Sequence, residues 1–353
     1  MNKRAFLFIV LSCFCTGIVN AQKMVFTLWG YEEMNHPLLE EILDSPTMQR
    51  LKSIDQSGPT RYFSIVPGFS RYDHCVGVWA LLKRANAPLA EQVTGLLHDA
   101  SHTAFSHLAD LLFKHDEVVN NGCYQDSIHE WFLDSMKIPT ITAKYDISLP
   151  MLNPDNHAYT ALEQPSPQLC ADRIQYNIHT GVVFHRITQQ DAREIVDDLH
   201  FENGQWFFGT PTIARKFADL SVAFTRQLWG AEYNHAFYQL FAEALRIALA
   251  EKLITRDEIH FGTDEQILSK LKKSKNKKIQ ECLKKCSNIY AHFEVVPYGK
   301  GTFNFKPKSR CIDPLVRIKK NRFKRLSEID RSFKKEFAAT KKWCQQGYGI
   351  NIV

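Results

Sequence analysis

Most of the chain carries apolar residues three and four positions apart, which is the spacing of amphipathic helices. Breakers such as Ser57-Gly58-Pro59 and Asn120-Asn121-Gly122 separate these segments. The predicted helices cover Leu39–Leu51, Val76–Lys83, Leu89–His98, Phe105–Lys114, Ser127–Met136, Ala214–Leu228 and His235–Leu253. Because strand-like alternation is scarce before residue 290, the pattern predicts a mainly α fold.

The C-terminal part of the chain has a different pattern. Thr263-Asp264-Glu265 is typical of a helix start. Farther on, His292–Val296 and Gly301–Phe305 read as strands that could pair around the turn Pro297–Lys300. The sequence therefore predicts a helical bundle over residues 22–265 and a smaller mixed region over residues 266–353.

Composition adds an uneven charge to this picture. The 353 residues are 44% hydrophobic and 23% charged, as in a folded globular protein. Residues 266–353 carry 23 Lys+Arg and 6 Asp+Glu, a net of +17, whereas residues 1–265 carry 21 and 32, a net of −11. The clusters Lys270–Lys285 and Arg317–Arg325 are either solvated faces or surfaces for polyanion contact.

The N-terminus resembles a secretory signal. Lys3 and Arg4 precede an apolar run from Ala5 to Val19, and Val19-Asn20-Ala21 fits a cleavage site before Gln22. Residues 1–21 are therefore expected to be a signal peptide, which predicts a secreted or periplasmic protein. The alternatives are an uncleaved anchor, lipidation at Cys13, which fits its sequence context poorly, or translation from Met24 giving a cytoplasmic protein.

The cysteines do not form a disulfide framework by their number or spacing. Seven remain beyond residue 21, an odd number thinly spread along the chain. Cys282 and Cys286 lie four apart in a lysine-rich segment without a partner pair of His or Cys, which disfavours a zinc site.

Chemistry concentrates between residues 98 and 110. Within a helix, His98 and Asp99 would point about 100° apart, and His102 would share the face of His98. His74, from a preceding helix, could close a cation site from a second direction. Such a density of ionisable groups beside an apolar helix is costly unless something binds them. The groups of this stretch are His98, Asp99, His102, His107 and Asp110.

Imidazoles and carboxylates together suit Mn, Fe, Ni, Zn or Co better than Ca, with Mg as a companion ion. A cation of this kind lowers the pKa of a water molecule and polarises a phosphoryl oxygen, so phosphate-ester hydrolysis is the predicted chemistry. Asp110 follows His107 by three residues, a spacing at which a carboxylate can hold an imidazole in one tautomer.

The wider pattern resembles the HD-domain metal-dependent phosphohydrolases, closest to their dNTP triphosphohydrolase (SAM-and-HD-domain-like) branch. The motif Arg71-Tyr-Asp-His74-Cys-Val-Gly77 is followed by His98-Asp99 and His102-x-x-x-Ser106-His107. Cys170-Ala-Asp172-Arg173-Ile-Gln-Tyr176 and His129-Glu130 continue the resemblance, which covers about two-thirds of the chain and fades after about residue 270.

The resemblance implies an HD helical bundle and a set of site residues. It implies four metal ligands, His74, His98, Asp99 and Asp172. It implies proton transfer around His102, His107 and His129, with Asp110 orienting His107. It implies phosphate contacts from Arg71 and Arg173, sugar packing by Tyr176, and Gln56 in the pocket wall. By the same analogy the protein forms a homo-oligomer.

Two classes of function remain open at this point. The first is a phosphohydrolase that acts on a nucleotide, a dNTP, NTP or nucleoside monophosphate, or on another small phosphate ester. The second is a nucleic-acid-binding protein or a nuclease that uses the basic C-terminal region. The dNTPase branch carries an acidic residue near the position of Thr180 and a bulkier apolar residue at the position of Ser57. This chain has neither, so selectivity for deoxyribose does not follow from the resemblance.

Overall fold

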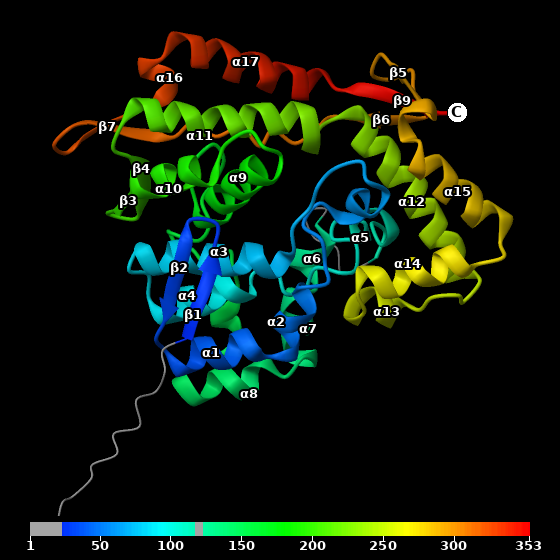
Figure 1. Ribbon diagram of the computed structural model, residues 1–353, viewed down its shortest axis with the longest axis horizontal. Coiled ribbons are helices and arrows are strands. Elements are labelled where there is room, and N and C mark those ends of the chain that lie inside the picture. Colours follow the sequence, from blue (N-terminus) through cyan, green and yellow to red (C-terminus); the bar gives the residue numbers. More distant parts are fainter. Residues whose placement is uncertain (1–22, 117–122) are drawn as a thin grey trace, which may run out of the picture.

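The computed structural model describes residues 23–116 and 123–353 (Figure 1). The predicted signal peptide therefore lies outside the described residues. Helices dominate, as the sequence predicts. Elements of the first half are β1 (Lys23–Thr27), β2 (Gly30–Met34), α1 (Pro37–Asp44), α2 (Pro46–Leu51), α3 (Arg71–Arg84), α4 (Leu89–Leu97), α5 (Ala109–Leu112), α6 (Tyr124–Ser127), α7 (His129–Ser135) and α8 (Ile138–Thr142).

The second half adds longer helices and short strands. In Figure 1, α11 and α17 run along one side of the molecule, and α12, α14 and α15 form one end. The elements are α9 (Ala171–Val183), α10 (Gln189–Asp197), β3 (Leu199–Glu202), β4 (Gln205–Phe208), α11 (Pro211–Phe224), α12 (Glu232–Ala250), α13 (Arg256–Phe261), α14 (Asp264–Lys273), α15 (Lys277–Ser287), β5 (Phe293–Val296), β6 (Phe303–Phe305), β7 (Leu315–Lys319), β8 (Arg322–Arg325), α16 (Leu326–Ile329), α17 (Arg331–Gln346) and β9 (Tyr348–Ile352).

One predicted helix is broken in two. The segment Leu39–Leu51 forms α1 and α2, because Ser45 is extended and Pro46 occupies the first turn of α2. The Ser45 hydroxyl accepts the amide hydrogen of Met48 at 3.3 Å, which caps the new helix. Proline is favoured at this position, where its missing N–H would be unpaired in any case.

Two other predictions around the cluster need correction. Helix α4 ends at Leu97, so His98 and Asp99 lie in a turn and not on a continuing helix. The predicted helix over Phe105–Lys114 is only the short α5, because Phe105 and Ser106 have φ values of 62° and 57°. Left-handed backbone of this kind cannot continue a right-handed helix.

The core is continuous along the chain. The largest fully buried side chain is Trp79, and the same apolar cluster reaches from Val25 to Ile350. Helix α14 begins at Asp264, so the predicted boundary between residues 265 and 266 falls inside a helix. Side chains from both predicted regions thus share one core, and their independence as domains stays a prediction.

The C-terminal strands pair differently from the predicted hairpin. β5 and β6 do not pair with each other, because β9 lies between them in the order β5-β9-β6. β9 is antiparallel to both, with Val295 opposite Ile350 and Phe303 opposite Ile350. A second sheet has the order β3-β4-β7-β8, with β4 parallel to β7. β9, at the end of the chain, therefore completes the sheet to which β5 and β6 also belong.

Gly301 allows β9 to approach. An added Cβ at this position would lie 2.8 Å from Gly349 Cα, against backbone that cannot rotate away. We expect Gly301→Ala to lower the free energy of unfolding by about 1–3 kcal/mol, as overpacking does. Urea denaturation measures it, with Glu294→Ala on an exposed position of β5 as the control. Equal stability of both variants would contradict the packing described.

No helix in residues 23–116 or 123–353 combines the length and the apolar character that crossing a bilayer requires. All seven cysteines in these ranges are free thiols.

Candidate active site

Three separate elements bring four donor side chains to one point. α3 carries His74, the turn after α4 carries His98 and Asp99, and the first turn of α9 carries Asp172. His74 Nε2 lies 3.2 Å from His98 Nε2 and 3.0 Å from Asp172 Oδ1. Asp99 Oδ2 lies 3.5 Å from His74 Nε2, and Asp99 Oδ1 lies 3.7 Å from His98 Nε2. The tertiary structure thus assembles the four residues that the resemblance implies.

The hydrogen bonds of the two histidines fit a cation between them. His98 Nδ1 lies 2.8 Å from the Gly95 carbonyl oxygen, and His74 Nδ1 contacts Gln175 Oε1. Both acceptors require a hydrogen on Nδ1, so Nε2 is the nitrogen of each ring that faces the carboxylates and could bind a cation. This array of acceptors needs a positive charge at its centre, and outer partners of this kind orient metal-ligating histidines. The donor set fits a divalent metal.

Arg71 and Arg173 lie beside this cluster. The buried Arg71 guanidinium pairs with Asp99 Oδ2 and donates to Ser106 Oγ at 2.8 Å, while its Nη2 has no hydrogen-bond partner among the described residues. Arg173 donates to the Gln168 carbonyl at 3.0 Å and lies 3.5 Å from Glu163. Each guanidinium is thus held in place on one side by the protein.

His102 and His129 are buried, and each has one ring nitrogen without a hydrogen-bond partner in residues 23–116 and 123–353. His102 Nε2 lies 3.2 Å from Asp99 Oδ1, and its Nδ1 is unpaired. His129 Nδ1 lies 2.9 Å from Ser101 Oγ, and its Nε2 is unpaired. Burial, assisted by repulsion from Arg71 at His102 and from His98 at His129, lowers the pKa of each to about 4. Both are therefore neutral at pH 7 and able to accept a proton.

His107 and Asp110 are less closely coupled than the sequence predicts. His107 Nδ1 and Asp110 Oδ2 are 3.8 Å apart, which is too long for a hydrogen bond. Asp110 instead accepts the Tyr124 amide hydrogen at 2.8 Å. The His107 ring lies edge-on to that of His102, with centroids 4.9 Å apart. His107 therefore borders the cluster, and its orientation is set by ring packing.

A cavity of about 810 Å³ opens over these groups. A second cavity of about 310 Å³ adjoins it and has aromatic walls from Tyr176, Trp229 and Tyr238. We call them the large cavity and the aromatic cavity. They share the lining residues Gln56, His107, Tyr176, Lys308 and Arg310. All the predicted site residues except His74 and Asp110 line the large cavity, and Asp110 lines the aromatic one.

The structure adds residues that sequence reasoning missed. Glu163 and Cys170 lie beside Asp172, with Cys170 Sγ 3.5 Å from Glu163 Oε2. Lys308 and Arg310, from the basic C-terminal region, line both cavities. Cys170 opens the motif that carries Asp172 but has no predicted role there, and Glu163, Lys308 and Arg310 belong to no spaced motif. Only the positive charge of the C-terminal region could have drawn attention to the last two.

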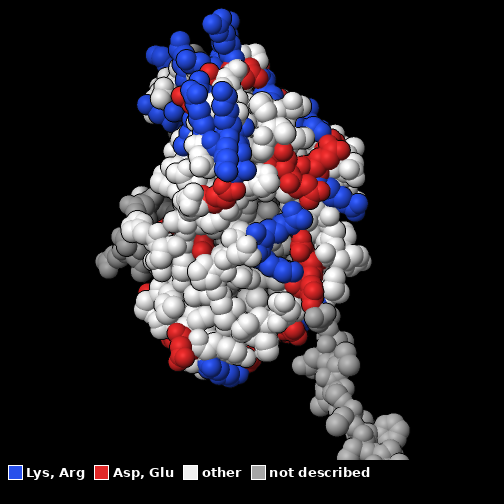
Figure 2. All heavy atoms as spheres, turned by 90° about the vertical axis from the view of Figure 1, so that its left-hand side faces the viewer, with Lys and Arg blue, Asp and Glu red and all other residues white. Residues whose placement is uncertain are grey.

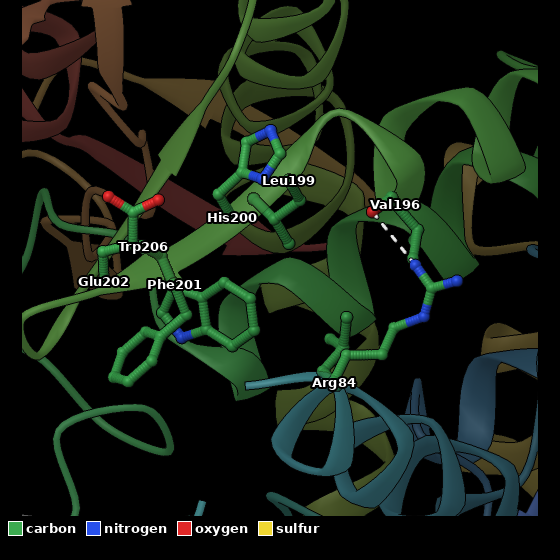
Figure 3. A pocket seen from close by; sticks show the side chains of 8 residues that line it. Arg84, Val196, Leu199, His200, Phe201, Glu202 and Trp206 are labelled. Carbon is green, nitrogen blue, oxygen red and sulfur yellow. Dashed lines mark hydrogen bonds between the residues drawn. The ribbon is translucent and has the colours of Figure 1, made fainter. Parts of the chain in front are cut away.

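A third, smaller hollow lies elsewhere, between the end of α3, α10 and β3 (Figure 3). Its volume is about 180 Å³. The Arg84 side chain extends toward α10 and donates to the Val196 carbonyl at 3.2 Å, as the dashed line shows. It contains none of the predicted site residues, so the candidate active site is the pair of cavities over the His–Asp cluster.

Comparison with known proteins gives a consistent picture, although no family model matches the chain. The uncharacterised protein YdhJ of Bacillus subtilis is 32% identical over 280 residues, 79% of this chain and 84% of that protein. The metal-dependent phosphohydrolase cns2 of Cordyceps militaris is 37% identical over 202 residues, 56% of this chain and 55% of that protein. The deoxynucleoside triphosphate triphosphohydrolase SAMHD1 of Bos taurus is 38% identical, but over only 21% of this chain and 15% of its own length.

Solved structures extend the likeness to the whole fold. A phosphohydrolase from Bacteroides thetaiotaomicron superimposes with a TM-score of 0.68 at 16% identity, covering 93% of this chain and 98% of that one. At that identity the likeness shows the fold alone. Together with the relatives that match in sequence, it places this chain in the family of HD-type metal-dependent phosphohydrolases.

Proposed function

We propose that this phosphohydrolase cleaves phosphate esters of nucleotides. The observation that carries the proposal is the continuity of the two cavities: a phosphoryl group at the His–Asp cluster would leave the rest of the substrate beside Tyr176, Trp229 and Tyr238. Aromatic walls suit a nucleobase or a sugar. The partial similarity to SAMHD1 supports the same substrate class.

His74, His98, Asp99 and Asp172 would hold the cation in this proposal. A divalent metal would polarise the phosphoryl group and lower the pKa of a water molecule. Nitrogen and carboxylate donors together favour Mn, Fe, Ni, Zn or Co. Arg71 Nη2 and Arg173 would neutralise charge on the phosphate oxygens, since guanidinium groups match phosphate geometry.

Proton transfer falls to three histidines that line the large cavity. The Ser101 hydroxyl donates to the Gln125 carbonyl at 3.2 Å and accepts from Gln125 Nε2 at 3.3 Å, which leaves one lone pair for the His129 Nδ1 hydrogen. His129 Nε2 would then accept or return a proton, and His102 or His107, which line the same cavity, would assist. Asp110 would influence the site only indirectly, because its carboxylate accepts the amide hydrogen of Tyr124.

Removal of metal tests the proposal directly. We expect chelation to abolish hydrolysis of dNTPs, NTPs and nucleoside monophosphates, and add-back of Mn, Ni, Co, Zn or Mg to restore it for at least one substrate. Phosphate release measures the reaction, and a mock-dialysed sample with its metal retained is the control. Hydrolysis that is unchanged after metal removal, or absent with every metal and nucleotide, contradicts the proposal.

A nucleic-acid contact is the second candidate function. Figure 2 shows Lys and Arg gathered at the upper end of one face, where Figure 1 places β7 and α16. Lys319, Lys320 and Arg322 are exposed at the turn between β7 and β8. A phosphate-backbone contact there predicts binding of DNA or RNA that weakens steeply with salt and survives loss of the metal ligands.

Export remains a proposal from the N-terminal pattern. N-terminal sequencing of the native protein would find Gln22 as the first residue of a secreted or periplasmic form, and Met24 if translation starts there. Met24 lies in β1 and pairs with Glu33, so both forms keep the hairpin β1–β2 nearly complete.

A further inference from the structure

The segment between β6 and β7 contributes Lys308, Ser309 and Arg310 to the lining of the large cavity. At its start, Phe305 pairs with Tyr348 of β9. At its end, the Ile312 amide donates to Ser221 Oγ of α11 at 3.0 Å, and the Asp313 amide donates to the Pro167 carbonyl at 3.1 Å. The segment is thus fixed on both sides, which holds Lys308 and Arg310 over the two cavities.

Lys308 and Arg310 differ from Arg71 and Arg173, which also line the large cavity. Arg71 pairs with Asp99, and Arg173 lies beside Glu163. Within the described ranges, neither Lys308 nor Arg310 has a carboxylate at ion-pair distance, and Arg310 instead lies over the Trp229 ring at 5.9 Å. A cation bound by Asp99 and Asp172 would neutralise much of the acidic charge below them. Neither Lys308 nor Arg310 would then have its charge cancelled by an ion pair within the described part of the chain.

Lys308 and Arg310 lie where they would contact a part of the substrate that the His–Asp cluster does not reach. Both residues line the large cavity and the aromatic cavity, as do His107 and Tyr176. Arg310 lies near enough to His107 and Tyr176 to act on them electrostatically, and Lys308 lies near enough to act on Asp126, which lines the large cavity. Two cations that line both cavities would favour a ligand with more negative charge than one phosphoryl group.

We propose that Lys308 and Arg310 bind a second phosphate group of the substrate, distinct from the phosphoryl group at the His–Asp cluster. This rests on the proposed function and narrows it to nucleotides with at least two phosphate groups. The second group belongs either to a polyphosphate chain or to the other end of the nucleoside. Lysine and arginine recognise both through charge-assisted hydrogen bonds.

Kinetics with three adenine nucleotides test the pair. ATP carries its additional phosphates in a chain, adenosine 3′,5′-bisphosphate carries one across the ribose, and AMP carries none. We expect Lys308→Met/Arg310→Met to raise KM about 10- to 100-fold for ATP or for the bisphosphate, and to change it less than about threefold for AMP. Whichever of the two loses affinity identifies the source of the phosphate. An equal loss with all three nucleotides, or no loss with any, overturns the proposal.

Binding without turnover separates this proposal from the proposed function. In calorimetric titrations of the protein with its metal, inorganic tripolyphosphate should bind about tenfold or more weakly to the double variant, and inorganic phosphate equally to both proteins. Equal tripolyphosphate affinities overturn the role of the pair, whatever the enzyme hydrolyses. Hydrolysis of no nucleotide by the wild type refutes only the proposed function.

Lys306 provides the matched control. It lies in the same segment, is exposed and contacts the Tyr298 ring at 5.0 Å, but it lines neither cavity. Lys306→Met removes the same charge from the same segment and should leave every KM and the tripolyphosphate affinity unchanged. Thermal unfolding of both variants shows whether the segment keeps its place, since its anchors lie outside the substituted positions.

Discussion

Replacement of His98 and Asp99 together with alanine is expected to lower kcat/KM for the best nucleotide by on the order of 10³-fold or more. The variant loses one imidazole and one carboxylate of the four donors, and a bound cation contributes several kcal/mol to phosphoryl transfer. It should also lose tight metal binding, measured by calorimetry or by elemental analysis after dialysis. His200→Ala, at an exposed position on β3, is the matched histidine control.

Loss of Asp99 also leaves the buried Arg71 without its partner, so part of the effect could come from altered structure. Asp172→Asn provides the second variant, because it removes a donor on α9 and leaves the Arg71–Asp99 pair intact. Both variants should lose metal binding, and Asp172→Asn should keep the unfolding temperature of the apo protein within a few degrees. Undiminished activity in either variant would refute the assigned metal site.

Asp264→Ala is expected to cost about 3–5 kcal/mol of stability, more than other single changes considered outside the active site. The carboxylate is fully buried and accepts the amide hydrogens of Asp55 at 2.9 Å and Phe105 at 2.6 Å, and the Tyr62 hydroxyl at 3.1 Å. Each donor left unpaired in the interior costs about 1–3 kcal/mol. Urea denaturation measures the loss, and Glu265→Ala, the exposed neighbour, should change stability by less than about 0.5 kcal/mol.

The same carboxyl group predicts a pH dependence. Burial raises the pKa of Asp264 to about 7. Between the unfolded pKa, about 4, and this value, the folded state holds a proton that the unfolded state releases. The resulting stabilisation is present at low pH and is lost as pH rises through about 7. The stability advantage of the wild type over Asp264→Asn should therefore be larger at pH 5 than at pH 8, and a constant difference would contradict the raised pKa.

Local patterns anticipated the elements and the chemistry of the candidate site. The three-and-four spacing placed α3, α4 and α12, and Thr263 is the cap of α14, as the sequence predicts. Where the predictions were wrong, a nearby contact or conformation prevailed over periodicity. Ser45 and Pro46 divide one predicted helix into α1 and α2. The left-handed backbone at Phe105 and Ser106 delays the start of another, so that only the short α5 forms.

The sequence by itself determined the helical elements, the cluster of histidines and carboxylates and the resemblance that links His74, His98, Asp99 and Asp172, because such signals lie within short spans of chain. Only the tertiary structure decided what these groups meet. The carboxylate of Asp264, at the start of α14, accepts the amide hydrogens of Asp55 and Phe105 from two other segments. The tertiary structure also places β9 between β5 and β6, and it brings Lys308 and Arg310 to the cavities. Contacts between distant segments follow from the packing of a shared core, and no local spacing records them.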